Sequence, residues 1–388
     1  MRSRSPVIFI GFAFAVLFAG CGVAGEDLIS PVPAERGGAD LGLGPGVRAL
    51  TSGPGDKGSP VLSPSGERLA FVMDGYVVKK DLATGASERQ TTRDFGAADV
   101  DWSNSGDGLT ISSISEEGES FSFYRTSGDD RDLNVQPVFE GALSVEDVPG
   151  ETDLLVAFED GAESSLALLQ KSGEPDRLFT RTIDGDVTGI SLSPNGEQAA
   201  ISVRQEESFV IFVLDLQEGT VREAVRTATG KEILGSPQWA RDGIYYIAGE
   251  GEAAGKTPVY NLYRLLQDTP ADAEVVSGVG EDFVSSNIRV SPDGGRLAVL
   301  GRRSLNSPAN LYILDLGSGD LQTATSNENL SIKTGPKDLS WSTDGESVLL
   351  VARAAPDDVA IRSASAERIA ADFNNIYEVP VGKLAEDQ

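Results

Sequence analysis

Short apolar runs and polar turns alternate along most of the chain. Runs at residues 69–72, 199–203 and 297–300 each follow a turn of the Ser-Pro-Asp-Gly type. A second apolar run comes roughly ten to twenty residues later, most clearly at 209–216 and 311–316. A more polar third run, and the run just before the turn, complete the unit. Each repeat is therefore predicted to hold four short strands separated by turns.

Aligning the chain on the turn shows seven repeats, of which the copy at 147–150 is degenerate. The turns lie at residues 63–66, 103–106, 147–150, 193–196, 240–243, 291–294 and 342–345, and their glycines are spaced by 40, 44, 46, 47, 51 and 51 residues. Such a period is typical of propeller blades or helical arrays. Helical periodicity is nearly absent, except at 364–373, where a short inserted helix is expected. The pattern predicts an all-β fold, a seven-bladed β-propeller with four strands per blade.

The two ends of the repeat region suggest how the ring closes. The last unit ends at its third strand, near 376–381, whereas residues 47–51 precede the first full unit as an unpartnered strand. We expect this N-terminal strand to complete the last blade, which removes an exposed sheet edge. The propeller is predicted to span residues 47–388.

The turns themselves are interpreted as structural. Proline presets φ at the second position, aspartate bonds to its own backbone, and glycine supplies positive φ. A catalytic group would not be expected in every repeat. Trp102, Trp239 and Trp341 share the position just before the turn, and we expect them to pack between neighbouring blades.

The repeats resemble a known family. The stretches LSPSGERLAFV, LSPNGEQAAISV and VSPDGGRLAVL, which begin at Leu62, Leu192 and Val290, are similar to the TolB-type, WD40-like (PD40) propeller repeat, and more distantly to the LpqB-type propeller. The resemblance implies a propeller fold and no particular activity.

The N-terminus has the features of a bacterial lipoprotein. Arg2 and Arg4 precede an apolar stretch at 7–17, which is too short to span a membrane. Residues 17–21, Leu-Phe-Ala-Gly-Cys, resemble a lipobox, which implies a signal peptide at 1–20, lipidation of Cys21 and a flexible tether at 21–46. The alternative is an ordinary cleaved signal with an incidental cysteine. Cys21 is the only cysteine, so no internal disulfide can form.

Composition narrows the function further. The net charge of −28 disfavours binding to nucleic acid or anionic lipid, although it is also explained by solubility. The chain contains no histidine. This excludes a Ser-His-Asp triad, a Cys-His pair and histidine-ligated zinc.

Candidate ligand-binding residues lie two and four places before each turn. The innermost strand of each blade borders the central channel, and polar residues alternate there with apolar ones. The strongest candidates are Asp99, Asp101, Gln238, Asn287, Arg289 and Asp338. They are expected to bind a peptide, a small polar ligand or calcium. A channel whose walls only bind water is the alternative.

Two other motifs are interpreted as surface loops. Residues 249–257 come close to a phosphate-binding loop but have Glu250 where that motif needs glycine. Residues 127–132 hold three aspartates in a turn, but the spacing does not match an EF-hand.

These observations together predict a monomeric, lipid-anchored, extracytoplasmic propeller that binds an envelope protein or peptide. We expect no enzymatic activity and no cofactor. The alternative is a calcium-dependent lactonase-like or lyase-like enzyme with Asp and Asn ligands in the channel.

Overall fold

The fold is taken from a computed structural model of the chain. It describes residues 43–382 except 53, 92–94, 104–105, 107, 115–120, 126–135, 141, 149–152, 161–162, 171–176, 251–258, 267–272, 277–282, 305, 328–329 and 355–372. All described strands belong to one compact unit, residues Pro31–Gln388. The signal peptide, Cys21, most of the tether, the turn at 127–132 and the helix expected at 364–373 lie outside the described residues, apart from Phe373.

The strands form seven antiparallel sheets, one for each predicted repeat. Blade 1 holds β2 (Lys57–Leu62), β3 (Arg68–Met73), β4 (Tyr76–Asp81) and β5 (Ser87–Arg89). Blade 2 holds β6 (Ala97–Trp102), β7 (Leu109–Ile114), β8 (Phe121–Arg125) and β9 (Gln136–Glu140). Blade 3 holds β10 (Ala142–Asp147), β11 (Asp153–Asp160), β12 (Glu163–Gln170) and β13 (Arg177–Asp184). Blade 4 holds β14 (Asp186–Leu192), β15 (Gln198–Arg204), β16 (Phe209–Asp215) and β17 (Val221–Arg226).

The remaining three blades follow the same order. Blade 5 holds β18 (Lys231–Ala240), β19 (Gly243–Glu250), β20 (Val259–Leu265) and β21 (Ala273–Val275). Blade 6 holds β22 (Val284–Val290), β23 (Arg296–Arg302), β24 (Asn310–Asp315) and β25 (Leu321–Thr323). Blade 7 holds β26 (Leu330–Ile332), β27 (Leu339–Trp341), β28 (Ser347–Ala354) and β29 (Asn375–Pro380), with β1 (Arg48–Ala49) at its outer edge.

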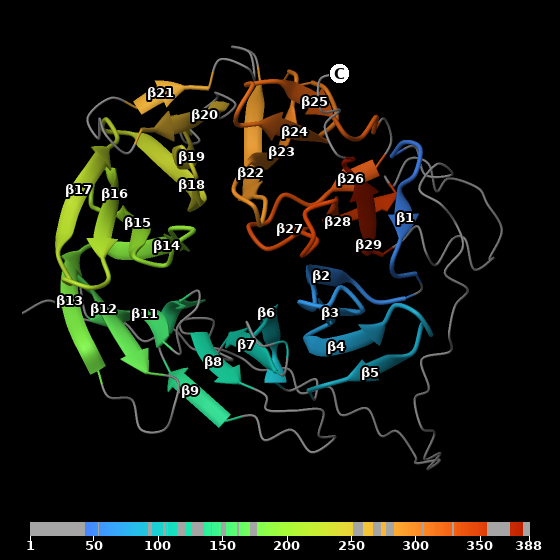
Figure 1. Ribbon diagram of the computed structural model, residues 1–388, viewed down its shortest axis with the longest axis horizontal. Helices are drawn as coiled ribbons and strands as arrows, with labels where there is room; N and C mark the ends of the chain where they lie inside the picture. Colours follow the sequence, from blue (N-terminus) through green and yellow to red (C-terminus); the bar gives the residue numbers. More distant parts are fainter. Residues whose placement is uncertain are drawn as a thin grey trace, which may run out of the picture. The chain divides into compact units, whose positions relative to one another are not determined.

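The seven sheets are arranged around a central channel, with the first strand of each blade innermost (Figure 1). Inner strands of successive blades contact one another, as β2 contacts β6 and β14 contacts β18, and β2 also contacts β27 and β28 of blade 7. The prediction of an all-β, seven-bladed propeller is confirmed. No helix among the described residues has the length and apolar character needed to cross a membrane.

The N-terminal segment lies beside the last strand of the chain. β1 lies beside β29 (Figure 1), and in this antiparallel pair Arg48 is opposite Glu378. Thr51 Oγ1 accepts a hydrogen bond from Ile376 N at 2.9 Å. A threonine has the same function in other blades, where Thr91 accepts from Val77 N and Thr325 from Leu311 N, both at 2.9 Å. That this segment latches the ring remains a prediction.

The repeated turn is held together by its own polar atoms. In blade 6, Gly294 N donates to Ser291 O at 2.8 Å, and Gly294 has a φ of 69°. Ser291 Oγ donates to Asp293 Oδ1 at 2.5 Å and accepts from Arg296 N at 2.9 Å. Ser342 and Asp344 are bonded in the same way in blade 7. Serine and aspartate in these turns therefore shape the backbone, as the sequence indicates.

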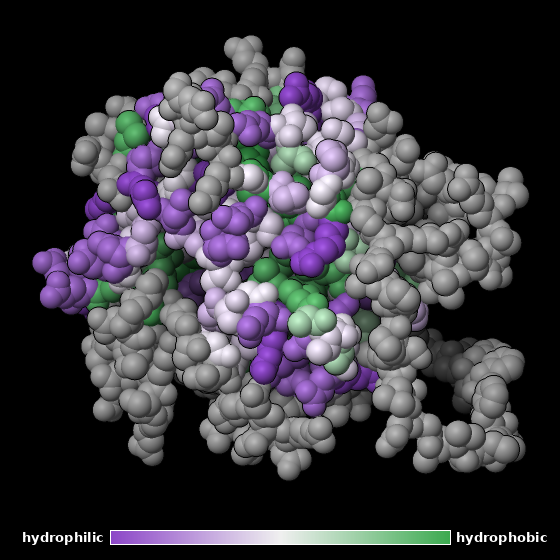
Figure 2. Space-filling model, turned by 45° about the vertical axis from the view of Figure 1, so that its right-hand side comes forward, coloured by the Kyte–Doolittle hydropathy of each residue, from purple (hydrophilic) through white to green (hydrophobic). Residues whose placement is uncertain are grey.

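Most clusters of the hydrophobic core lie between neighbouring blades. Trp102, Trp239 and Trp341 are 6%, 4% and 9% exposed and lie in three such clusters. Trp102 Nε1 donates to Val61 O of blade 1 at 3.2 Å, and Trp341 Nε1 donates to Arg289 O of blade 6 at 2.9 Å. The predicted packing of tryptophan between blades is confirmed. On the face shown in Figure 2, hydrophilic side chains predominate on the protruding parts of the coloured surface.

The innermost strand of blade 7 differs from the prediction because it is interrupted. β26 and β27 both pair with β28, but pairing stops at Ile332 and resumes at Leu339. Between them, Asp338 N donates to Gly335 O at 3.0 Å and closes a turn. Pro336 has no N–H for a strand ladder and favours the second position of a turn, which explains the interruption.

Candidate functional site in the central channel

A polar cavity of about 220 Å³ lies in the central channel. Its walls come from the innermost strands of all seven blades and from the turn between β26 and β27. The cavity is lined by Ser59, Pro60, Val61, Asp99, Val100, Asp101, Glu146, Ile190, Ser191, Leu192, Ser236, Gln238, Arg289, Lys337, Leu339 and Ser340. It is small enough to suit a side chain, a chain end or a small polar molecule.

The uncharged polar residues of the lining connect neighbouring blades. Ser340 Oγ of blade 7 donates to Pro60 O of blade 1 at 2.6 Å. Ser191 Oγ of blade 4 accepts from Trp239 N of blade 5 at 3.0 Å. These hydroxyl groups are used in holding the ring together, which explains part of the polar alternation on the inner strands.

Gln238 of blade 5 also connects neighbouring blades. Its Oε1 accepts from Val290 N of blade 6 at 3.3 Å, and its Nε2 donates to Pro237 O at 3.1 Å. Its amide thus links two blades while it lines the cavity.

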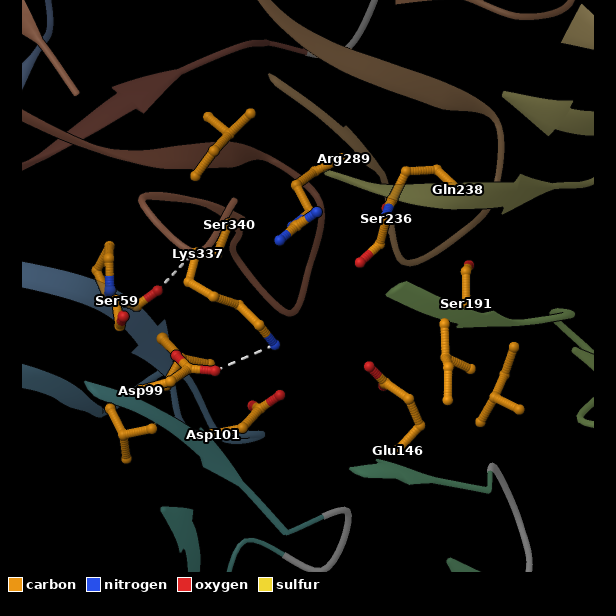
Figure 3. A pocket seen from close by; sticks show the side chains of 16 residues that line it. Ser59, Asp99, Asp101, Glu146, Ser191, Ser236, Gln238, Arg289, Lys337 and Ser340 are labelled. Carbon is orange, nitrogen blue, oxygen red and sulfur yellow. Dashed lines mark hydrogen bonds and ion pairs between the residues drawn. The ribbon is translucent and has the colours of Figure 1, made fainter. Parts of the chain in front are cut away.

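Carboxylates gather on one side of the cavity. Asp99 and Asp101 come from β6 of blade 2, and Glu146 comes from β10 of blade 3. Lys337 Nζ lies 3.2 Å from Asp99 Oδ2, and its side chain extends toward this acidic side (Figure 3). Asp101 Oδ1 also accepts from Trp102 N at 2.7 Å. Three carboxylates therefore face one ammonium group here.

Arg289 lies on the opposite side of the cavity, on β22 of blade 6 (Figure 3). Its guanidinium group donates to Ile288 O and to Pro336 O, so it holds the turn that carries Lys337. The cavity thus has an acidic side from blades 2 and 3 and a basic group from blade 6. A ligand with both charged and hydrogen-bonding groups is complementary to such a lining.

The charges in the channel shift one another's pKa values. Desolvation, together with Asp101 and Asp99, raises the pKa of Glu146 to about 7, although Lys337 and Arg289 act to lower it. The attraction of Asp99 raises the pKa of Lys337 above its ordinary value and keeps the amine charged. Desolvation lowers the pKa of Arg289, while Glu146 and the two aspartates oppose this shift. A pKa of about 7 means that Glu146 changes charge near neutral pH.

The predicted site residues fall into two groups. Asp99, Asp101, Gln238 and Arg289 line the cavity. Asn287 and Asp338 do not line it and instead hold the turn at 335–338: Asn287 Nδ2 donates to Gly335 O at 2.6 Å, and Asp338 Oδ1 accepts from Ser59 N at 3.4 Å.

Two charged lining residues, Glu146 and Lys337, are missing from the sequence-based set. Asp147 pairs with Leu154 as Trp102 pairs with Leu109, so Asp147 ends its inner strand and does not begin the turn. Glu146 is therefore the counterpart of Asp101. The sequence alignment of the repeats therefore starts the degenerate turn at 147–150 one residue too early. Because a shift of one residue exchanges the two faces of a strand, this alignment assigns Glu146 to the wrong face. Lys337 follows the Gly335-Pro336 pair, and this pair is the feature of the sequence that predicts a turn at this place.

Within the described residues, no three His, Cys, Asp or Glu side chains are placed to hold a metal ion. Lys337 is paired with Asp99 and competes with a cation for the carboxylates of the channel. The calcium site expected as an alternative is not favoured by this arrangement. Most of the phosphate-loop-like segment, residues 251–257, lies outside the described residues.

The fold and the channel define the chain as a β-propeller whose inner strands carry a charged cavity. Residues 178–385, more than half of the chain, match the family model described as the lipoprotein LpqB beta-propeller domain. The chain belongs to this family, and the resemblance to TolB-type and LpqB-type propellers is confirmed. None of the curated protein sequences compared with the chain matches it.

Solved structures resemble the chain in fold at low sequence identity. The β-propeller domain of the Trilobed protease from Pyrococcus furiosus is 14% identical, with a TM-score of 0.55 over 78% of this chain and 93% of that one. Oligogalacturonate lyase from Vibrio parahaemolyticus is 15% identical, with a TM-score of 0.55 over 87% of this chain and 94% of that one. TolB from Acinetobacter baumannii is 14% identical, with a TM-score of 0.45 over 83% of this chain and 78% of that one.

The expectation that the protein is not an enzyme is wrong, because the propeller fold does not exclude an enzyme. Oligogalacturonate lyase is an enzyme by name, and its fold matches nearly the whole of this propeller. At this identity the likeness concerns the fold alone. The fold admits catalysis as well as binding.

Proposed function

We propose that the protein is a lipid-anchored, extracytoplasmic propeller that binds a protein or peptide of the bacterial cell envelope in its central channel. The observation that carries this proposal is the charged cavity, in which side chains from blades 2, 3, 6 and 7 converge. The name of the family, a lipoprotein propeller domain, and the lipobox-like residues before Cys21 support the anchor and the location.

A protein segment is the ligand that suits this cavity best. Its volume of about 220 Å³ accommodates a single large side chain or a chain end. Acidic, basic and hydroxyl groups line the same cavity, and a peptide offers a charged group together with backbone donors and acceptors. Ligand sites of this kind fix orientation with a few convergent polar groups.

Site-specific photo-cross-linking in cells tests the binding function. A diazirine analogue of leucine replaces Val61, an apolar residue of the cavity wall. The same analogue at Val275, which is 53% exposed on β21, is the matched control. We expect one envelope protein to be cross-linked from position 61 and not from 275. Equal capture from both positions would show that the channel is not the binding site.

The anchor is tested separately by Cys21→Ser. The full-length wild-type chain is expected in the membrane fraction, and the variant in the soluble extracytoplasmic fraction, because one acyl-modified residue is its membrane attachment. Membrane association unchanged by Cys21→Ser would contradict the lipid anchor.

An enzymatic activity in the same channel is the second candidate. The pKa of Glu146 is about 7, which is the range in which a carboxyl group serves as a general acid or base. The lyase with the same fold supports testing acidic oligosaccharides as substrates. Turnover that is lost in Glu146→Gln would favour this candidate over a binding function alone.

A further inference from the structure

Lys337 is carried into the channel by a turn that lies outside the strand ladder. Residues 335–338, Gly-Pro-Lys-Asp, form the turn, with Pro336 in the second position and Lys337 in the third. Both strands that flank it pair with β28, but the turn itself does not. The sequence thus places a lysine at the tip of a segment that interrupts an inner strand.

Side chains and backbone groups from two neighbouring blades hold this turn in place. Asn287 and Arg289 of blade 6 donate to its carbonyl groups, at Gly335 O and Pro336 O. Ser59 N of blade 1 donates to Asp338 Oδ1. Each of these contacts involves a side chain and none is part of a strand ladder, so the turn can change its contacts without breaking a sheet.

The turn lies between two cavities. The second cavity, of about 320 Å³, is lined by Asp56, Lys57 and Lys333 among others. Both cavities have Ser59 and Lys337 in their walls. Lys337 is therefore part of the boundary of both cavities.

Lys337 occupies the position at which the channel attracts a cation. Its ammonium group is paired with Asp99 and faces the side of the cavity that carries Asp101 and Glu146 (Figure 3). The side chain of Lys337 is 49% exposed and that of Asp99 is 22% exposed. Ion pairs with such access to water contribute little to stability, so another cation can replace this one at small cost.

We infer that Lys337 is an internal occupant of the central cavity, and that a ligand replaces it with an ammonium group of its own. The inference rests on the proposed binding function and specifies its ligand: a segment that presents a lysine side chain to Asp99, Asp101 and Glu146. A free amino terminus or a polyamine has the same chemistry. When the ligand binds, the turn at 335–338 gives up the contact of Lys337 with Asp99.

The experiment measures affinity for small probes with the full-length chain. Nα-acetyl-lysine methylamide is titrated by saturation-transfer NMR at pH 8, with the norleucine analogue as the uncharged control. Glycine methylamide and spermidine distinguish a chain terminus and a polyamine from a side chain. The variants are Lys337→Met, Lys337→Arg and Asp99→Asn, and Lys231→Met, which lines neither cavity, is the matched control. Hydrogen exchange of residues 333–338 is followed with and without the lysine probe.

The expected results differ between the variants. The lysine probe binds and the norleucine probe does not. Lys337→Met binds the lysine probe about two- to fivefold more tightly than the wild type, which corresponds to the loss of one partly exposed ion pair. Lys337→Arg and Lys231→Met bind as the wild type does, Asp99→Asn binds about tenfold more weakly, and the probe accelerates exchange in 333–338.

The inference is overturned if Lys337→Met binds no ammonium probe, or binds it no more tightly than the wild type while its melting temperature is unchanged. A loss of folding in Lys337→Met, with Lys337→Arg folded and exchange in 333–338 unaffected by the probe, would likewise show that the turn is only structural. Cross-linking from position 61 that persists in either case would leave the proposed function standing. The two failures are therefore distinguishable.

Discussion

Glu146→Gln tests the electrostatics of the channel through protein stability. Its carboxyl group has an ordinary pKa of 4.5, which the channel raises to about 7, mainly by desolvation and by the neighbouring aspartates. Between about pH 4.5 and 7, Glu146 is therefore protonated in the folded protein and ionised in the unfolded chain. Stability contributed by this group is fully present below pH 4.5 and is lost as the pH rises to about 7.

The size of the effect follows from the shift. A shift from 4.5 to about 7 corresponds to about 3 kcal/mol at 1.36 kcal/mol per pH unit. Because Glu146 is partly exposed to the channel, this value is the upper bound. Glutamine resembles the protonated acid and does not titrate. The variant should therefore gain up to about 3 kcal/mol over the wild type between pH 5 and pH 8.

Urea denaturation at pH 5, 6, 7 and 8 measures this difference. Glu163→Gln, an exposed residue of β12 in the same blade, is the matched control. We expect Glu146→Gln to become progressively more stable than the wild type as the pH rises, and Glu163→Gln to follow the wild type throughout. Parallel pH profiles of the two variants would refute the placement of Glu146 in a desolvated acidic cluster.

Four further predictions concern the closure of the ring, the repeated turns and calcium binding. Thr51→Val removes the acceptor of the buried Ile376 N and should lower the free energy of unfolding in urea by about 1 to 3 kcal/mol, whereas Thr182→Val, at an exposed position, should leave it unchanged. Deletion of residues 47–52 should lower the melting temperature sharply, and an unchanged melting temperature would count against a latch. Ser291→Ala removes two hydrogen bonds of the turn and should lower the free energy of unfolding by about 1 to 2 kcal/mol without changing ligand binding. Loss of binding in a variant of unchanged stability would show that the turn is part of a binding site. Millimolar calcium should leave the melting temperature unchanged, and a rise of several degrees would reinstate the calcium site.

The repeat pattern was sufficient to predict the fold because each blade uses the same local physics. Turn residues such as Ser291 and Gly294 determine where an inner strand ends, and alternation along the strand determines which face borders the channel. These signals are local, so a single sequence carries them. Asp99, Asp101, Gln238 and Arg289 were found in this way.

The rest of the site depends on relations that lie outside one repeat. The position of Glu146 depends on strand register in blade 3, where the turn signal is weak and a shift of one residue changes the face. Lys337 reaches the cavity because it lies in the turn between β26 and β27, which Asn287 and Arg289 of blade 6 hold in place, and it pairs there with Asp99 of blade 2. Asn287 was expected to bind a ligand and instead holds the turn. Polar residues of inner strands line the channel, but pairing between distant blades decides which of them remain available to a ligand.

The central claim is that the charged cavity binds the partner, and the double variant Asp101→Asn/Arg289→Gln tests it most directly. Asp186→Asn/Arg204→Gln removes an exposed ion pair of blade 4 and is the matched control. Photo-cross-linking from position 61 is measured in each background, with melting temperatures to verify folding. The account predicts that capture of the partner is lost in the channel variant and retained in the control. Undiminished capture in a folded channel variant would contradict it.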